Sequence, residues 1–230
     1  MDFSPFTTLS FDCYGTLIDW EAGMLPVLRD LLARHNCSLP DGAILELYAE
    51  FEADAESGPY RSYREVLQSV VLAFGKRLGF QPSPPEISSL DQSVPAWPPF
   101  GDTVAALKRL RKRYKLAVIS NIDDDLFART RTLLDAEFDA VITAEQAQSY
   151  KPSHRNFELA LQALRIPREH LLHVGQSIYH DVVPARSLGV ATVWVNRKSA
   201  RPGIGAVRAS EGRPDLEVPD LASLAALAVE

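Results

Sequence analysis

Cysteine is scarce in this 230-residue sequence, and long apolar runs are missing. The two cysteines, Cys13 and Cys37, do not make a disulfide framework, and no Cys/His spacing resembles a structural zinc site. No stretch approaches the roughly 18 apolar residues of a membrane span, and the N-terminus lacks a basic segment followed by an apolar one. We therefore expect a cytoplasmic protein in which Cys13 is a small packing residue.

Positive charge is also in short supply, because 24 Lys and Arg stand against 30 Asp and Glu, for a formal net charge of −6. The basic residues are scattered except for a run at 108–115, which is typical of a solvated helix face. Neither a nucleic acid nor a membrane is therefore expected as a partner. We expect a small-molecule substrate, bound by a monomer or a homodimer.

Short runs rich in β-forming residues alternate with helical patterns along most of the chain. The expected strands are residues 7–11, 115–120, 138–143, 171–174 and 190–195. Helical patterns at 101–114, 124–134, 153–165 and 179–188 precede the last four of them. This alternation is typical of βαβ units with a parallel sheet. The sequence predicts an α/β fold whose core is a doubly wound, Rossmann-like parallel sheet.

The interval between the first two strands is too long for a single crossover. Within it, residues 21–35, 41–56 and 60–78 have apolar residues at spacings of three and four, as in Ile44, Leu47, Tyr48 and Phe51. We expect an inserted all-helical cap at 20–92, with the α/β core formed by 1–19 and 93–230. The return segment 80–100 contains six prolines, which favours an extended, semi-rigid connector.

Polar residues follow the strands that are expected to lie side by side. Asp12 ends the first strand, and Ser120 and Asn121 end the second. Lys151 lies beyond the third strand, and the fourth leads to a loop containing Gln176, Ser177 and Asp181. Singly, each has an ordinary explanation as a cap or a solvated residue. Together they predict a ligand site at the carboxyl edge of the sheet, whereas His173, inside an apolar strand, is expected to be a hydrogen-bonded core residue.

With these motifs in this order, the sequence resembles the haloacid dehalogenase superfamily of hydrolases. The matching stretches are FDCYGTL, VISN, YKPS and GQSIYHD, which contain Asp12, Ser120, Lys151 and Asp181. Residues 20–92 stand where the superfamily inserts a helical cap. Tyr14 occupies the position at which its phosphatases usually carry a second aspartate, so the chain is most similar to the L-2-haloacid dehalogenase group.

The resemblance implies an (S)-2-haloacid dehalogenase-like hydrolase that acts on short 2-haloalkanoic acids. Asp12 would attack C2, expel halide and form an aspartyl ester that water then hydrolyses. Thr16 and Ser177 would orient Asp12, and Lys151 would lower its pKa. Asp181 would position the hydrolytic water. Tyr14 would shape the pocket, while Ser120 and Asn121 would receive the substrate carboxylate.

Two departures from the phosphatase pattern bear on the cofactor. A tyrosine at position 14 is poorly matched to acid/base chemistry at neutral pH, and halide needs no proton to leave. Gln176 stands where the phosphatases usually keep a metal-binding aspartate. No metal or other cofactor is therefore expected. Two alternatives stay open: a Mg²⁺-dependent phosphatase of a small metabolite, with Asp12, Gln176 and Asp181 as ligands, and a catalytically weak ligand-binding protein.

One feature of the dehalogenase group is missing from the cap. The stretch ELYAEFEA, residues 46–53, lacks the arginine that helps those enzymes to expel halide, and Ala49 stands near its position. The next stretch, PYRSYREVL, supplies Arg61 and Arg64 at a spacing of three. We expect these two arginines either to replace the missing one as substrate-binding residues or to belong to a solvated helix face.

Overall fold

A parallel sheet of six strands forms the centre of this computed structural model, which describes residues 1–197 and 210–229. The strands are β1 (Thr8–Phe11), β2 (Lys115–Ser120), β3 (Ala140–Thr143), β4 (Leu171–Gly175), β5 (Ala191–Val195) and β6 (Leu216–Val218). Their order across the sheet is β3-β2-β1-β4-β5-β6, and every neighbouring pair is parallel. The predicted α/β fold with a doubly wound sheet is confirmed.

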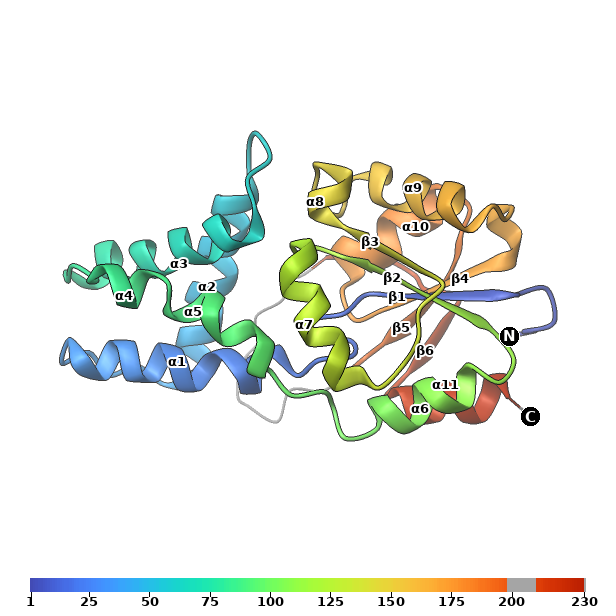
Figure 1. Ribbon diagram of the computed structural model, residues 1–230, viewed down its shortest axis with the longest axis horizontal. Helices are drawn as coiled ribbons and strands as arrows, with labels where there is room; N and C mark the ends of the chain where they lie inside the picture. The colour runs from blue at the N-terminus through green and yellow to red at the C-terminus, as the bar shows by residue number, and fades with distance from the viewer. Residues whose placement is uncertain (198–209, 230) are drawn as a thin grey trace.

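Helices cover both faces of this sheet. The longer ones are α6 (Thr103–Leu110), α7 (Asp124–Leu134), α9 (His154–Leu164) and α11 (Leu221–Ala228), with the short α8 (Ala144–Ala147), α10 (Val183–Ser187) and η2 (Arg168–His170) between them. Figure 1 shows α9 and α10 above the sheet and α6 and α11 below it. All four residues of β1 are buried, as expected for a central strand covered on both faces.

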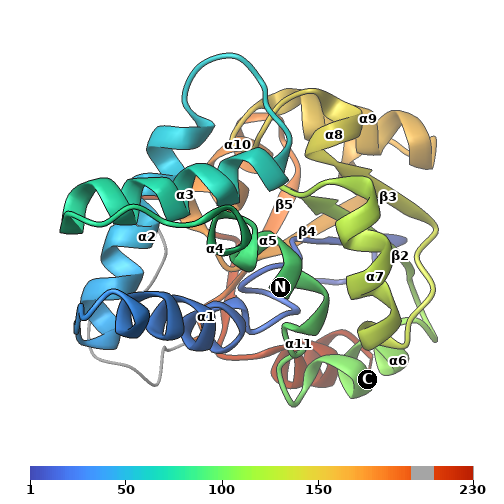
Figure 2. The same ribbon diagram turned by 60° about the vertical axis from the view of Figure 1, so that its left-hand side comes forward.

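A second group of helices, here called the helical layer, comprises α1 (Trp20–Arg34), α2 (Asp41–Glu56), α3 (Tyr63–Leu78), α4 (Pro84–Ile87) and α5 (Ser89–Ser93). Figures 1 and 2 both place it at one end of the sheet. Helix α3 begins where Ser62 and Glu65 form a capping box and ends at Gly79, whose φ of 81° suits glycine. The exact boundaries of the cap at 20–92 stay a prediction.

Three parts of the chain differ from the expectation. The proline-rich connector is not extended but folds into α4, α5 and the short η1 (Val94–Ala96), because Pro84, Pro85 and Pro95 occupy first-turn positions where their missing N–H is harmless. The helix expected at 179–188 is split into a π-helical turn, η3 (Ile178–Val182), and α10. Strand β6 and helix α11 were not predicted at all.

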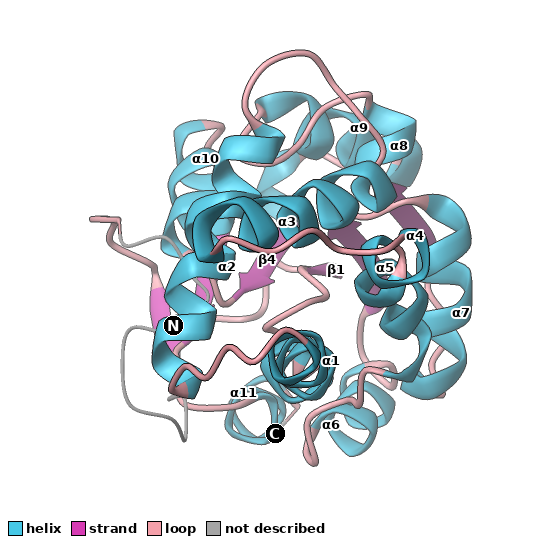
Figure 3. Cartoon of the chain, turned by 90° about the vertical axis from the view of Figure 1, so that its left-hand side faces the viewer, coloured by secondary structure: helices cyan, strands magenta, loops and turns pink. Residues whose placement is uncertain are grey.

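The topology fixes where a ligand site can form. The chain runs outward from β1 to β3, then returns to β4 beside β1 and runs outward again to β6. The reversal between β1 and β4 opens a crevice at their carboxyl ends. In Figure 3, where the helical layer faces the viewer, the ends of β1 and β4 lie behind it. None of the described helices is long and apolar enough to cross a membrane.

Candidate active site

Asp12 lies directly after β1, at the carboxyl edge of the sheet. Its main-chain N–H donates to the carbonyl of Val174 at 2.9 Å, so the β1–β4 pairing continues to this residue. The loop then turns sharply, with Gly15 at a φ of 93°, and brings Thr16 back beneath Asp12. The Thr16 hydroxyl donates to Asp12 Oδ2 at 2.7 Å, as predicted, and accepts the N–H of Gln176 at 2.9 Å.

Lys151 joins the two carboxylates of the site. Its Nζ donates to Asp12 Oδ1 at 2.8 Å, to Asp181 Oδ1 at 2.6 Å and to the carbonyl of Ile119 at 3.0 Å. Because an ammonium has three N–H donors, all of them are used. The side-chain amide of Asn121 holds the Lys151 main chain from both sides, accepting its N–H at 2.7 Å and donating to its carbonyl at 3.1 Å. The Asn121 amide therefore positions Lys151, whereas we expected it to contact the substrate.

Burial and charge set the pKa values of this trio. Asp12 and Lys151 are 8% and 2% exposed, and Asp181 is fully buried. Burial opposes ionisation of Asp181, but Lys151 and His173 hold the pKa of its carboxyl well below the ordinary value. For Asp12, burial raises the pKa and outweighs the lowering by Lys151 and Thr16. Lys151 thus lowers the pKa of Asp12 as expected, but burial, together with the neighbouring Asp181 carboxylate, raises it by more.

Asp181 is placed by residues of β4 and the loop after it. The register pairs Ser10 with His173, whose ring nitrogens contact Ser10 Oγ at 2.9 Å and Asp181 Oδ1 at 3.2 Å. A Cβ at Gly175 would lie 2.5 Å from the Asp181 Cγ, so only glycine leaves room for this carboxylate. His173 is the hydrogen-bonded core residue that we expected, and its partner is a site carboxylate.

Ser177 departs from the prediction that it orients Asp12. Its N–H donates to Asp181 Oδ2 at 3.2 Å, and its hydroxyl accepts the N–H of His180 at 3.0 Å. The residue therefore caps the π-helical turn η3 and supports Asp181 instead. Such turns are frequent at functional sites because they displace side chains from the regular helical positions.

These residues line a cavity of about 400 Å³ between the sheet and the helical layer. Its walls on the sheet side include the predicted Asp12, Tyr14, Ser120, Asn121, Lys151, Gln176, Ser177 and Asp181. The Tyr14 hydroxyl bonds to Thr130 Oγ1 at 2.8 Å, and burial raises its pKa well above the ordinary value. Ser120 is buried, and its hydroxyl has no hydrogen-bond partner among the described residues. Four strand ends thus meet at one cavity, as the sequence indicated.

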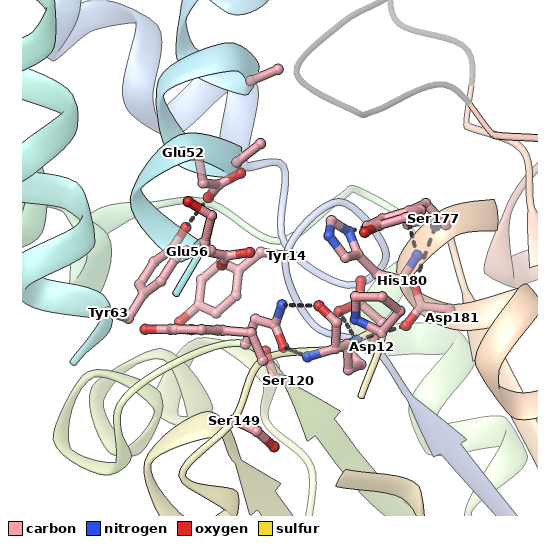
Figure 4. A pocket seen from close by; sticks show the side chains of 18 of the residues that line it. Asp12, Tyr14, Glu52, Glu56, Tyr63, Ser120, Ser149, Ser177, His180 and Asp181 are labelled. Atoms are coloured by element: carbon pink, nitrogen blue, oxygen red, sulfur yellow. Dashed lines mark hydrogen bonds and ion pairs between the residues drawn. The ribbon is translucent and has the colours of Figure 1, made fainter. Parts of the chain in front are cut away.

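The helical layer contributes residues to the cavity that the sequence reasoning missed. Glu52 and Glu56 line it from α2, together with Trp20, Tyr60 and Tyr63. Figure 4 shows both glutamates across the cavity from Asp12 and Asp181. Glu52 Oε1 accepts the hydroxyl protons of Tyr48 at 2.8 Å and Tyr63 at 2.7 Å. The stretch ELYAEFEADAE carries their signal, because Glu52 and Glu56 are spaced four residues apart and so lie on one side of a helix.

Arg61 and Arg64 do not line this cavity. Arg61 precedes α3 and donates to the carbonyl of Ala55 and to Ser69 Oγ. Arg64 Nη1 donates to the buried Asp91 at 2.8 Å, and its Nη2 donates to Asp125 at 2.8 Å. The structure thus places both side chains on partners outside the cavity, and their role in substrate binding stays a prediction.

A metal would require ligands at Asp12, Gln176 and Asp181. The ammonium of Lys151 stands between the two aspartates and bonds to an oxygen of each. Within residues 1–197 and 210–229, no group of three or more His, Cys, Asp or Glu side chains is arranged to hold a metal ion. Gln176 offers a neutral oxygen where a carboxylate is wanted, and the Lys151 ammonium already bonds to Oδ1 of both aspartates, so the residues present do not fit Mg²⁺.

Comparison with known proteins gives this arrangement a family. A model described as haloacid dehalogenase-like hydrolase matches residues 6–189. An (S)-2-haloacid dehalogenase of Pseudomonas putida is 28% identical over 206 residues, covering 85% of this chain and 88% of that protein. A second, from Pseudomonas sp. (strain YL), is 27% identical over 200 residues and covers 82% of each chain. The structure of an L-2-haloacid dehalogenase from Xanthobacter autotrophicus has a TM-score of 0.81 at 21% identity, over 96% of this chain and 98% of that one. The chain is a hydrolase that belongs to the haloacid dehalogenase-like hydrolase family.

Proposed function

We propose that this protein hydrolytically dehalogenates short 2-haloalkanoic acids through an ester on Asp12. The observation that carries the proposal is the placement of the Asp12 carboxylate at the cavity wall, fixed by Thr16 at 2.7 Å and Lys151 at 2.8 Å. Two relatives that cover most of the chain are (S)-2-haloacid dehalogenases. A Xanthobacter autotrophicus dehalogenase of similar fold is known with chloropropionic acid covalently bound.

The first step needs an ionised carboxylate and no acid. An Asp12 oxygen attacks C2 of the substrate, the carbon–halogen bond breaks with inversion, and halide departs with the bonding electrons. Tyr14 is unsuited to donate a proton, because its hydroxyl is bonded to Thr130 and its pKa is raised by burial. A tyrosine at this position suits halide, which leaves as a stable anion, better than an alkoxide, which needs a proton.

The second step hydrolyses the ester. Water attacks Cγ of Asp12, the bond from Cγ to the ester oxygen breaks, and the 2-hydroxy acid leaves with the proton from water. Asp181 stays ionised because Lys151 and His173 lower its pKa, so it can orient the water. A role for Ser120 in receiving the substrate carboxylate is supported by its hydroxyl, which has no hydrogen-bond partner among the described residues, and by its position in the cavity lining. Since the residues do not fit Mg²⁺, no step of this scheme uses a cofactor.

Replacement of the proposed nucleophile tests the scheme. Asp12→Asn keeps the size of the side chain but cannot attack, and we expect halide release to fall below about a hundredth of the wild-type rate. Asp54→Asn, at an exposed position of the same chain, is the matched control and should retain full activity. In ¹⁸O-water, the product of a single turnover should carry no label, because its oxygen comes from Asp12. Label in that first product would show direct attack by water and refute the ester.

A further inference from the structure

Two glutamates face the cavity and have no part in the steps above. Glu52 and Glu56 are four residues apart on α2, a spacing that puts both on one side of the helix. Among the described residues that line the cavity, Lys151 is the only lysine or arginine, and all its donors are taken by Asp12, Asp181 and Ile119. Glu56 receives no hydrogen bond from the described part of the chain. The side of the cavity formed by α2 therefore presents two carboxyl groups, and no lysine or arginine among the described lining residues is free to pair with them when they ionise.

Aromatic rings surround the same end of the cavity. The rings of Tyr60 and Tyr150 have centroids 5.4 Å apart, and those of Tyr63 and Tyr150 lie 6.4 Å apart. All three tyrosines line the cavity with Trp20. The hydroxyl of Tyr60 is buried and has no hydrogen-bond partner in the described structure. Aromatic faces beside carboxylates are the surroundings in which proteins bind ammonium groups, because the ring quadrupole attracts a cation.

The cavity is also larger than a short haloacid requires. Its volume of about 400 Å³ lies in the range of roughly 300–1,000 Å³ that holds drug-sized ligands. With C2 of the substrate beside Asp12 and its carboxylate near Ser120, the part of the cavity under Glu52 and Glu56 would stay empty for a three-carbon acid. A longer substrate chain would extend into that part, so its far end meets the two glutamates.

We propose that Glu52, Glu56 and the three tyrosines form a subsite for a positively charged nitrogen group at the far end of the substrate chain. The natural substrate class is then a 2-haloacid with an amino or quaternary ammonium terminus. This assignment rests on the proposed function only for the placement of C2 at Asp12. Burial raises the pKa of Glu52 to about 7 and that of Glu56 well above its ordinary value. A bound cation supplies a positive charge beside these two carboxyl groups and so favours their ionised forms.

Binding of two halogen-free acids tests the subsite without any chemistry. The probes are 4-(trimethylammonio)butanoate and 5,5-dimethylhexanoate, which share shape and carboxylate and differ in the charged nitrogen. By calorimetry we expect the wild-type protein to bind the ammonium acid about tenfold or more tightly than its neutral counterpart. Glu56→Gln should reduce that ratio to a few-fold, and Glu52→Gln with Glu56→Gln should abolish it. Glu46→Gln, at an exposed position on α2, should leave it unchanged.

Equal affinity for the two acids in the wild-type protein, or a ratio unaffected by the double substitution, would overturn the subsite. The 2-chloro forms of the same acids test the chemistry separately. The quaternary nitrogen cannot close a ring onto C2, so chloride release reports the enzyme alone. Preferential binding of the ammonium acid without Asp12-dependent chloride release would refute the proposed function and leave the subsite standing. Chloride release at equal kcat/KM from both acids would support the function and reject the subsite.

Discussion

Glu52→Gln is expected to make the stability of the protein less sensitive to pH. Glu52 accepts hydrogen bonds from Tyr48 and Tyr63, and burial raises its pKa to about 7. A glutamine at this position keeps an oxygen for the same two hydroxyls, so the substitution removes the charge and little else. The groups facing Glu52 are those two tyrosines and, one helical turn away, Glu56.

Proton linkage gives the sign and the size of the change in the free energy of unfolding with pH. A carboxyl whose pKa is higher in the folded state binds its proton more tightly there, so its contribution to stability is present below about pH 4.5 and is lost as the pH rises to about 7. Each unit of difference in pKa corresponds to about 1.4 kcal/mol, so the loss is about 3 kcal/mol. Glu56 changes the stability in the same direction, because burial and then the Glu52 carboxylate raise the pKa of Glu56.

Urea unfolding at pH 4.5 and pH 8 measures the free energy of unfolding of the wild-type protein and of Glu52→Gln. We expect the free energy of unfolding of Glu52→Gln, relative to the wild type, to rise by about 3 kcal/mol between the two pH values. Glu46→Gln, exposed on the same helix, should follow the wild type at both. A Glu52→Gln protein whose pH dependence parallels the wild type would show that Glu52 is ionised in the folded state, and the account of an uncompensated carboxylate would fail.

Two further predictions concern the residues around Asp12. Gly175→Ala would place a Cβ 2.5 Å from Asp181, so we expect the free energy of unfolding to fall by about 1–3 kcal/mol and halide release to slow. The control is Gly101→Ala, whose Cβ would meet no atom within 4 Å and which should change neither quantity. Thr16→Val removes a hydrogen bond that lowers the pKa of Asp12, so the acid limb of the pH profile of kcat/KM should move to higher pH. Thr16→Ser keeps a hydroxyl and should leave the acid limb where it is in the wild type. An acid limb that does not move in Thr16→Val would mean that the ionisation of Asp12 does not determine it.

The sequence alone determined the sheet and the sheet side of the site. The polar motifs follow strands, directly at Asp12 and after a short connection at Lys151 and Asp181. Because neighbouring parallel strands end at one edge, these three residues could be expected to lie close together. The helical nature of residues 20–78 was equally visible, because apolar residues at spacings of three and four mark a buried face whatever it packs against. Strand β6 escaped notice because a three-residue strand carries too short a pattern.

Only the tertiary structure decided what faces the cavity from the helical layer. The apolar stripe of α2 locates the side packed in the core, but it does not tell which of the remaining positions lie over another domain and which face water. Arg61 and Arg64 were predicted to bind substrate, but their side chains bond to Ala55 and Asp91 outside the cavity. Glu52 and Glu56 were not predicted as site residues but line the cavity, because packing α2 against α3 leaves that side of the helix over Asp12. Orientation of this kind depends on contacts between segments far apart in the chain, which local sequence patterns do not encode.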